Sequence, residues 1–231
     1  MGQPDRLSVR VIAAISPEEA GWLVSDPVLR AECEKRGVAL EPIIASLRHP
    51  ADERLRRADL ESSHRTFFRF LDALGHRGIR FVVIGGMAAR IYGSTFATED
   101  CDICHARDEE NLDRLATFLR GLTAEFRRPP AHAAAELSAE VFATETDFVF
   151  TTPWGKFDLI GEFTGVGRYE QAVDGSIPLR LGRHRARVLA LDKLALAKKS
   201  TGRDKDQRVH QELEVVRVAR ELLDRSTSKV G

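Results

Sequence analysis

Two aspartates at alternate positions are the residues of this chain best suited to chemistry. Asp100 and Asp102 stand in the run TEDCDI at 98–103. Successive side chains on a strand point to opposite faces, so both carboxylates project to the same side. Two carboxylates at such a short distance repel each other unless a cation lies between them. Oxygen ligands of this kind suit Mg²⁺, which keeps several waters and shares substrate phosphates, and we expect a magnesium site here.

A glycine pair lies upstream, where a buried strand turns into a helix. The apolar run FVVI at 81–84 is typical of a strand covered on both faces. Gly85 and Gly86 let the backbone turn sharply and come close to another group. The following residues, 87–92, predict a short helix closed by Gly93. The N–H groups at such a helix start favour phosphate binding.

In this order and at this spacing, the two features resemble the signature of the nucleotidyltransferase superfamily, an apolar-Gly-Gly turn followed by an acid-x-acid pair. The segment GGMAARIYGSTFATEDCDI at 85–103 most resembles the corresponding segment of the bacterial group that includes the AbiEii-type abortive-infection toxins. The resemblance covers roughly residues 65–220. It implies an α/β (α+β) fold with a small mixed β-sheet flanked by helices, and backbone contacts from the glycine pair to a triphosphate.

A third carboxylate is predicted on a later strand. Residues 147–152 and 156–160 read as two strands joined by the turn TPWG. Asp158 is flanked by apolar residues, and a charge in a core strand needs a partner. In the superfamily a third acid on a neighbouring strand completes the metal site, so the resemblance implies that Asp158 joins the pair. The alternative is a surface-facing Asp on an edge strand.

The run LDKLALAKKSTGRDKD at 191–206 carries the second resemblance to the AbiEii-type group. The family pattern is matched here by four residues: Lys198, Arg203, Lys205 and Asp206. The resemblance implies that Lys198 binds the nucleotide phosphates, which suits a point charge. Lys193 and Lys199 compete for this role, and an ordinary exposed helix lysine is the alternative. Asp206 would orient Lys198, accept a proton or cap a helix.

The loop before the acid pair departs from the family pattern in one place. Relatives often carry Arg where this chain has Phe96, and a Phe cannot bind phosphate. Thr98 is expected to support the metal loop by hydrogen bonding and to contribute to the nucleotide site.

The remaining pattern divides the chain into three parts. Residues 1–62 predict a helical N-terminal appendage with helix starts at Ser16, Asp26 and Glu41. Its role is either that of a scaffold or a docking surface for a macromolecule. Residues 63–190 form the predicted nucleotidyltransferase core, and 191–231 are C-terminal helices that pack on it. Within the core, 61–74 predicts an amphipathic helix with a buried aromatic stripe, and 161–175 predicts a loop.

A basic hairpin is predicted at 177–189. It carries five basic residues: Arg180, Arg183, His184, Arg185 and Arg187. They would hold phosphates of RNA or of a triphosphate, or form a solvated face.

Composition limits the remaining classes of function. The 231 residues are 43% hydrophobic and 30% charged with a formal net charge of zero, so no global basic field draws in nucleic acid. No apolar run has the length of a membrane span, and the first residues lack a signal-peptide layout, so we expect a cytoplasmic protein with no membrane partner. The odd count of cysteines, Cys33, Cys101 and Cys104, fits a reducing compartment. The run CDICH matches a haem-attachment pattern, but that chemistry needs an exported chain.

The function implied is Mg²⁺-dependent transfer of NMP from an NTP. Asp100 and Asp102, helped by Asp158, would hold two Mg²⁺ ions, and Asp158 lies near the acceptor side. A macromolecular acceptor is favoured, with tRNA first and protein as another, and the chain would be the toxin of a toxin–antitoxin pair with a cognate antitoxin. The alternatives are a small-molecule, antibiotic-type nucleotidyltransferase and a catalytically weak nucleotide-binding protein.

Overall fold

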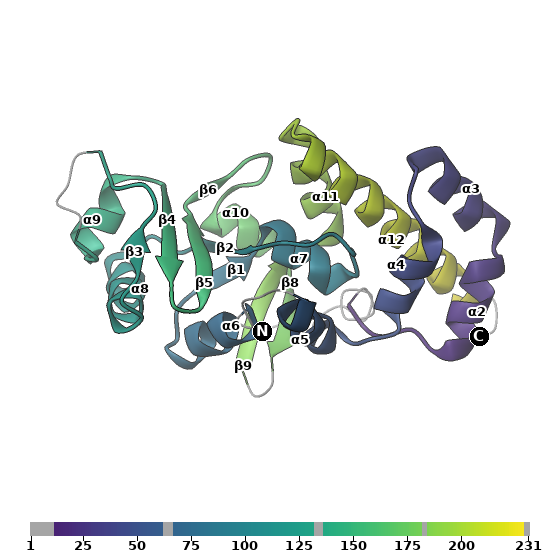
Figure 1. The fold of residues 1–231 in the computed structure, drawn as a ribbon, viewed down its shortest axis with the longest axis horizontal. Helices are drawn as coiled ribbons and strands as arrows, with labels where there is room; N and C mark the ends of the chain where they lie inside the picture. The colour runs from purple at the N-terminus through teal and green to yellow at the C-terminus, as the bar shows by residue number, and fades with distance from the viewer. Residues whose placement is uncertain (1–11, 62–66, 132–135, 182–183, 229–231) are drawn as a thin grey trace.

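A seven-stranded mixed β-sheet runs through one half of the molecule (Figure 1). The computed structural model describes residues 12–61, 67–131, 136–181 and 184–228. The strand order is β3-β4-β5-β2-β1-β9-β8. The strands are β1 (Phe81–Val83), β2 (Asp100–His105), β3 (Glu125–Phe126), β4 (Asp147–Thr152), β5 (Gly155–Ile160), β8 (Ser176–Leu181) and β9 (His184–Leu189). The predicted class, a mixed α/β sheet flanked by helices, is confirmed.

The register of the central strands decides where the carboxylates meet. Strand β2 pairs antiparallel with β1 and parallel with β5. In this pairing Asp102 stands directly opposite Asp158. Because β5 lies between β4 and β2, the alternative of an edge-strand Asp158 is wrong.

Two helices cover the face of the sheet opposite the carboxylates. They are α6 (Phe67–His76) and α8 (Glu109–Gly121). Phe70 of α6 stacks on Phe157 of β5 with ring centroids 4.9 Å apart, and Phe118 of α8 meets the same ring edge-on at 6.1 Å. Since Phe157 and Asp158 are consecutive on a strand, their side chains point to opposite faces. The predicted aromatic stripe is therefore core, although the predicted helix start at Glu61 is wrong, because Glu61 ends the preceding helix and 62–66 lie outside the described residues.

The prediction of a loop at 161–175 is wrong. This segment forms a small two-stranded sheet and a helix: β6 (Glu162–Phe163), β7 (Gly167–Arg168) and α10 (Tyr169–Asp174). These elements are too short to show a periodicity in the sequence. The burial of Ala172 against the main sheet, a long-range contact, stabilises the helix.

Four helices precede the sheet: α2 (Pro17–Ser25), α3 (Pro27–Arg36), α4 (Leu40–Leu47) and α5 (Ala51–Glu61). The predicted helix start at Ser16 is confirmed, and it is closed by a capping box. The Ser16 backbone N–H donates to the Glu19 carboxylate at 2.7 Å, and the Glu19 N–H donates to Ser16 Oγ at 3.1 Å. Helix α3 ends at Gly37, whose φ of 63° is in the left-handed region.

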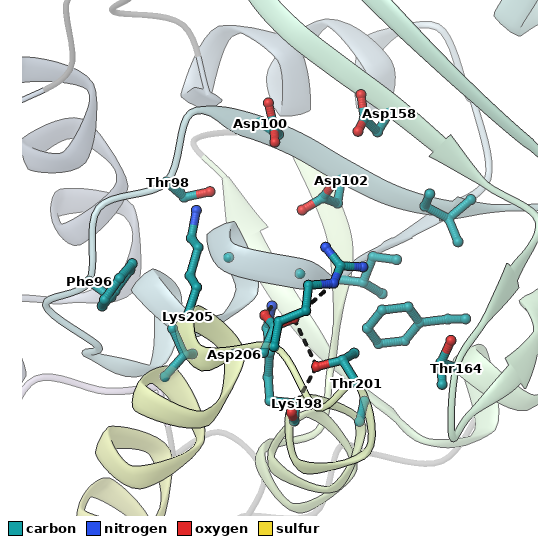
Figure 2. Close-up of a pocket in the computed structure, with 18 of the residues that line it drawn as sticks. Phe96, Thr98, Asp100, Asp102, Asp158, Thr164, Lys198, Thr201, Lys205 and Asp206 are labelled. Atoms are coloured by element: carbon teal, nitrogen blue, oxygen red, sulfur yellow. Dashed lines mark hydrogen bonds and ion pairs between the residues drawn. The ribbon is translucent and has the colours of Figure 1, made fainter. Parts of the chain in front are cut away.

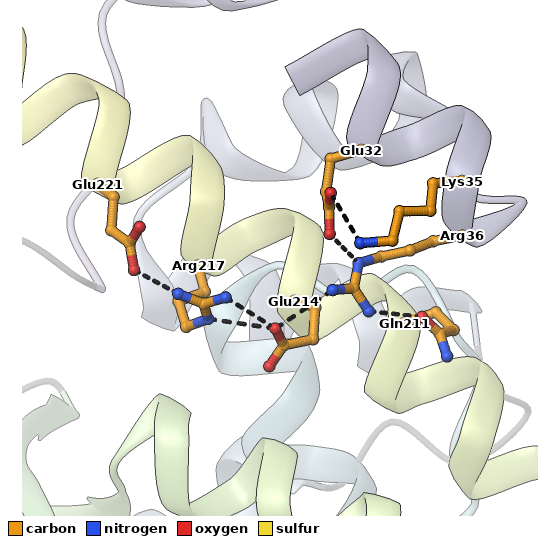
Figure 3. A network of polar contacts seen from close by, with 7 residues as sticks. All are labelled: Glu32, Lys35, Arg36, Gln211, Glu214, Arg217 and Glu221. Atoms are coloured by element: carbon orange, nitrogen blue, oxygen red, sulfur yellow. Dashed lines mark hydrogen bonds and ion pairs between the residues drawn. The ribbon is translucent and has the colours of Figure 1, made fainter. Parts of the chain in front are cut away.

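Four further helices are α7 (Gly85–Tyr92), α9 (Ala139–Thr144), α11 (Leu191–Ser200) and α12 (Asp204–Ser228), of which α9 packs on α8. Helix α5 packs on α6 and α7, and α3 packs on α12. Arg36 of α3 donates to Gln211 of α12 at 2.7 Å and lies 3.5 Å from the Glu214 carboxylate (Figure 3). The buried apolar core is continuous across the predicted boundaries, and the division into three parts stays a prediction.

No helix in the described ranges has both the length and the apolar character needed to cross a membrane.

Candidate active site

A cavity of about 290 Å³ lies where β2 and β5 meet the start of α7 and the turn between α11 and α12 (Figure 2). Every residue that the sequence predicted for the site lines this cavity: Gly85, Gly86, Thr98, Asp100, Asp102, Asp158, Lys198 and Arg203. Long-range packing has therefore brought together residues from three separate segments. Their roles stay predictions.

The Asp100–Asp102 pair carries negative charge that its surroundings do not relieve. Burial, reinforced by the nearby Asp158 and Asp100 carboxylates, raises the pKa of Asp102 to about 7. Oδ1 of Asp100 is buried and has no hydrogen-bond partner within the described part of the chain. Its nearest cation is Lys156, whose Nζ lies 4.0 Å away. A divalent cation at this pair would satisfy the orphaned oxygen and favour the ionised form of Asp102, so these residues fit a magnesium ion.

The glycine pair comes close to other groups, as predicted, and the structure identifies these groups as the side chains of Asp102 and Thr98. Gly85 has a φ of +65°, and a Cβ at this position would overlap the Asp102 carboxylate. A Cβ on Gly86 would overlap the Thr98 hydroxyl. The backbone N–H of Gly86 also bonds Asp102 and opposes the rise of its pKa. The two glycines thus let β2 and its carboxylate lie against the positive end of α7.

Asp158 has a partner that the sequence analysis missed. The Arg127 guanidinium forms an ion pair with Asp158 and donates through Nε to the Phe150 carbonyl at 3.2 Å. Burial raises the pKa of Asp158, and Arg127 opposes that rise. Among the described residues no three acidic, histidine or cysteine side chains stand ready to hold one metal ion. If Asp158 joined Asp100 and Asp102 at a metal ion, it would share its carboxylate between the ion and Arg127.

Lys198 is distinguished from its neighbouring lysines by its position. It lines the cavity, and its Nζ donates to Asp206 at 2.5 Å, whereas Lys193 and Lys199 are exposed and lie outside the cavity. The hydroxyl of Thr201 donates to the other Asp206 oxygen at 2.8 Å. Burial acts to raise the pKa of Asp206, but the hydrogen bonds from Lys198 and Thr201 hold it below its usual range. Of the roles considered for Asp206, orienting Lys198 is the one this geometry supports.

Two further cations stand at the mouth of the cavity. Lys205 Nζ lies 5.7 Å from the centroid of the Phe96 ring, and both residues line the cavity (Figure 2). A positive charge is therefore present beside Phe96, the position at which this chain departs from the motif that it resembles. The side chain of Arg203 is 79% exposed, and its Nε is 3.7 Å from Asp206.

The predicted basic hairpin lies away from this cavity. None of its described residues lines it, and Arg183 is outside the described ranges. Arg187 has a structural role, since it donates to the hydroxyl and the carbonyl of Ser176 at 2.6 and 2.8 Å. The triphosphate interpretation of the hairpin is therefore not supported, and its contact with RNA stays a prediction.

Sequence reasoning also missed Lys156. It pairs across the sheet with Asp100 and donates to Glu99 at 2.7 Å. A signal was present, because Lys156 precedes Asp158 by two positions and so shares its face of the strand. Arg127 gave no such signal, since its contact with Asp158 depends on the pairing of β3 and β4.

Comparisons with solved structures find distant similarity. No protein-family model and no curated protein matches the chain. The solution structure of the antibiotic-resistance factor ANT(2'')-Ia is similar with a TM-score of 0.41 and 14% sequence identity, over 71% of this chain and 93% of that one. Similarity of this extent leaves the activity to be argued from the chain's own residues. The finer assignment to the AbiEii-type group stays a prediction.

Proposed function

We propose that this protein is an Mg²⁺-dependent nucleotidyltransferase that moves NMP from an NTP to an RNA acceptor. One observation carries the proposal. The Asp100–Asp102 pair, with one carboxylate oxygen of Asp100 unpartnered, shares a single cavity with the partly buried Lys198. A cation site and an anion-binding lysine on opposite walls are what a metal-bound triphosphate requires.

The residues of the chain divide the chemistry between them. A magnesium ion held by Asp100 and Asp102 would neutralise negative charge on the triphosphate. Lys198 binds phosphate oxygens from the opposite wall, and Asp206 fixes the direction of its ammonium group. Lys205 and Arg203 attract the phosphates at the cavity mouth.

The transfer itself is a single displacement. The acceptor hydroxyl oxygen bonds the α-phosphorus, the bond between the α-phosphorus and its bridging oxygen breaks, and pyrophosphate leaves. Asp158, once separated from Arg127, is the carboxylate that takes the acceptor proton. Because this chemistry depends on positioning and charge, it needs no nucleophilic side chain.

The choice of acceptor and the biological role rest on the resemblance of residues 85–103 and 191–206. We infer a tRNA acceptor, a toxin paired with a cognate antitoxin, and a cytoplasmic location. Expression in a bacterial host should then arrest growth, and Asp100→Ala should abolish the arrest. Unchanged toxicity of that variant would contradict the toxin role.

A labelling assay tests the acceptor. The purified protein is incubated with Mg²⁺, each α-³²P-labelled NTP in turn, and either total tRNA, lysate protein or small-molecule antibiotics. We expect label in tRNA with one preferred NTP, and none with the Asp100→Ala/Asp102→Ala variant. Label in an antibiotic would assign the small-molecule alternative, and label in protein would assign a protein acceptor. NTP binding without any transfer would identify a catalytically weak nucleotide-binding protein.

A further inference from the structure

A second cavity of about 290 Å³ lies between α4, α5 and α7. Its charged and titratable lining is basic: His49, Arg54, Arg57 and Arg90. No carboxylate is among the residues that line it. The rest of the wall is small or uncharged, with Pro42, Ala45, Ser46 and Thr95.

Arg54 forms the floor of this cavity and is 2% exposed. All five N–H donors of its guanidinium are used by backbone carbonyls: those of Ile12 at 3.5 Å, Ala13 at 3.2 Å, Ser46 at 3.1 Å, Leu47 at 3.2 Å and Ile91 at 2.5 Å. Within the described part of the chain its hydrogen-bond partners are all carbonyls. Carbonyl oxygens satisfy the N–H donors but leave the net positive charge uncompensated, so a buried cation of this kind favours an anion nearby.

A second arginine, Arg90, is buried in the wall, and Arg57 and His49 are the cationic or titratable side chains that an incoming anion can reach at the rim. Arg90 is 8% exposed and donates to the Ser94 carbonyl at 3.3 Å. The Arg57 side chain is 51% exposed and lies 2.8 Å from His49 Nε2. Glu53 pairs with His49 at 2.9 Å and with Arg57 at 3.6 Å. Solvent-exposed pairs of this type contribute little, so a phosphate oxygen can replace the Glu53 carboxylate.

The loop before the acid pair separates this cavity from the catalytic one. Thr95 lines the basic cavity, and its neighbour Phe96 lines the catalytic cavity. Glu212 of α12 fixes this loop, since it accepts from the Thr95 N–H at 2.9 Å and from the Thr95 hydroxyl at 2.6 Å. An acceptor strand that reaches Asp100 from this side must cross the loop and pass the basic cavity.

We propose that the basic cavity binds a backbone phosphate of the RNA acceptor while the acceptor's hydroxyl lies in the catalytic cavity. The inference rests on the proposed function for the nature of the acceptor. Guanidinium groups match phosphate oxygens in a forked geometry, which Arg57 at the rim can offer, and the buried Arg54 contributes its uncompensated positive charge. The site also explains how a chain with zero net charge holds a polyanion, because the attraction is local.

Fluorescence anisotropy with a short labelled single-stranded RNA tests the proposal across a range of salt concentrations. The variants are Arg57→Gln, His49→Gln and the double variant, all at the rim, so that the buried Arg54 stays in place. Arg114→Gln is the matched control, because Arg114 lies on α8 outside both cavities. Arg185→Gln examines the competing basic hairpin. Binding is also measured in an Asp100→Ala background, so that a failure of catalysis is not read as a failure of binding.

We expect Arg57→Gln to weaken RNA binding about fivefold and to reduce the salt slope by about one phosphate contact. The NTP affinity and the affinity of Arg114→Gln for RNA should be unchanged. RNA affinity equal to that of the control would overturn the proposal, as would a loss confined to Arg185→Gln. Thermal unfolding in inorganic phosphate gives a third test. If phosphate stabilises the wild type, the rim variants lose this stabilisation, and their RNA affinity is unchanged, the proposal is overturned. That outcome would assign the cavity to free phosphate. If label transfer to a small molecule is found and no RNA binds, the proposed chemistry stands and this inference fails.

Discussion

Two cavities of equal volume, about 290 Å³ each, lie on either side of one loop and carry opposite charges. The catalytic cavity contains the carboxylates of Asp100, Asp102 and Asp158, and the basic cavity contains three arginines. The formal net charge of the chain is zero. Acidic side chains therefore predominate in the catalytic cavity and basic side chains in the other. The first would suit a metal-bound triphosphate, and the second would suit an RNA phosphate.

The two cavities are also held together in different ways. The carboxylates of the catalytic cavity stand on paired strands, and their positions follow from strand register and from the two glycines that admit Asp102 and Thr98. The arginines of the basic cavity stand on helices, and backbone carbonyls at helix ends hold Arg54. Substitutions can therefore disable one cavity and leave the other intact.

The largest effect is expected for Asp102→Asn. Removal of this carboxylate takes away half of the cation site, and the transfer rate should fall on the order of a thousandfold. The same variant should unfold at a higher temperature, because burial and the neighbouring acids penalise the charged form of Asp102. Transfer rates and thermal unfolding of both proteins check this pair of outcomes. Glu99→Gln is the matched control, and full activity in Asp102→Asn would refute the role of the acid pair.

The next effect is expected for Gly85→Ala. The added Cβ would displace the Asp102 carboxylate, and misplacement of a metal ligand should slow transfer about a hundredfold. Gly202→Ala is the control, because Gly202 has a similar φ of +69° but nothing within 4 Å of its Cβ position. Transfer rate and RNA affinity are measured together. An equal loss of activity in the two variants would mean that backbone strain, and not the Asp102 contact, is the cause.

These two residues also illustrate how much of the site could be predicted from the sequence. The strand, the glycine turn and the acid pair are close in the chain, so their pattern is visible without the fold. Asp158 was predictable because a charged residue in an apolar strand needs a partner. Lys198 could be named, but only the structure separates it from Lys193 and Lys199.

The rest of the site depends on contacts between distant segments. Glu212 holds Thr95 across 117 positions of sequence, and Arg127 reaches Asp158 across 31. The basic cavity combines α4, α5 and α7, and none of its arginines stands in a recognisable motif. The elements at 162–174 are too short for a periodicity to appear. Helix starts, in contrast, follow local chemistry, as the capping box at Ser16 shows.

A smaller effect that couples the two cavities is expected for Glu212→Ala. Loss of its hydrogen bonds to Ser94 and Thr95 would loosen the loop that separates them. Transfer rate and RNA affinity should each fall about tenfold, since a slightly misplaced site loses much of its efficiency. Glu221→Ala, on the same helix and facing Arg217, is the control. A change in one activity without the other would show that the loop does not serve both cavities.

The smallest effect concerns the scaffold that both cavities share. Burial acts to raise the pKa of Glu214, but Arg217 and Arg36 hold it below its usual range. A group with a lowered folded pKa stabilises the protein above its unfolded pKa and loses that contribution as the pH falls through the folded value. Glu214→Gln should therefore cost about 1 kcal/mol in the free energy of unfolding at neutral pH and less in acid. Urea unfolding of the wild type and of Glu214→Gln at neutral and at acidic pH checks this. A larger loss of unfolding free energy in acid than at neutral pH would contradict it.

The most direct test of the central claim follows the two ends of the triphosphate separately. Wild-type protein, Mg²⁺ and total tRNA are incubated with the preferred NTP, labelled either at the α- or at the γ-phosphate. The account predicts that α-label enters the acceptor and γ-label leaves as pyrophosphate, and that both events are absent in Asp100→Ala. Entry of γ-label into the acceptor would show phosphoryl transfer, and release of γ-label as inorganic phosphate without α-transfer would show hydrolysis. Either result would contradict the assignment of this cavity to nucleotidyl transfer.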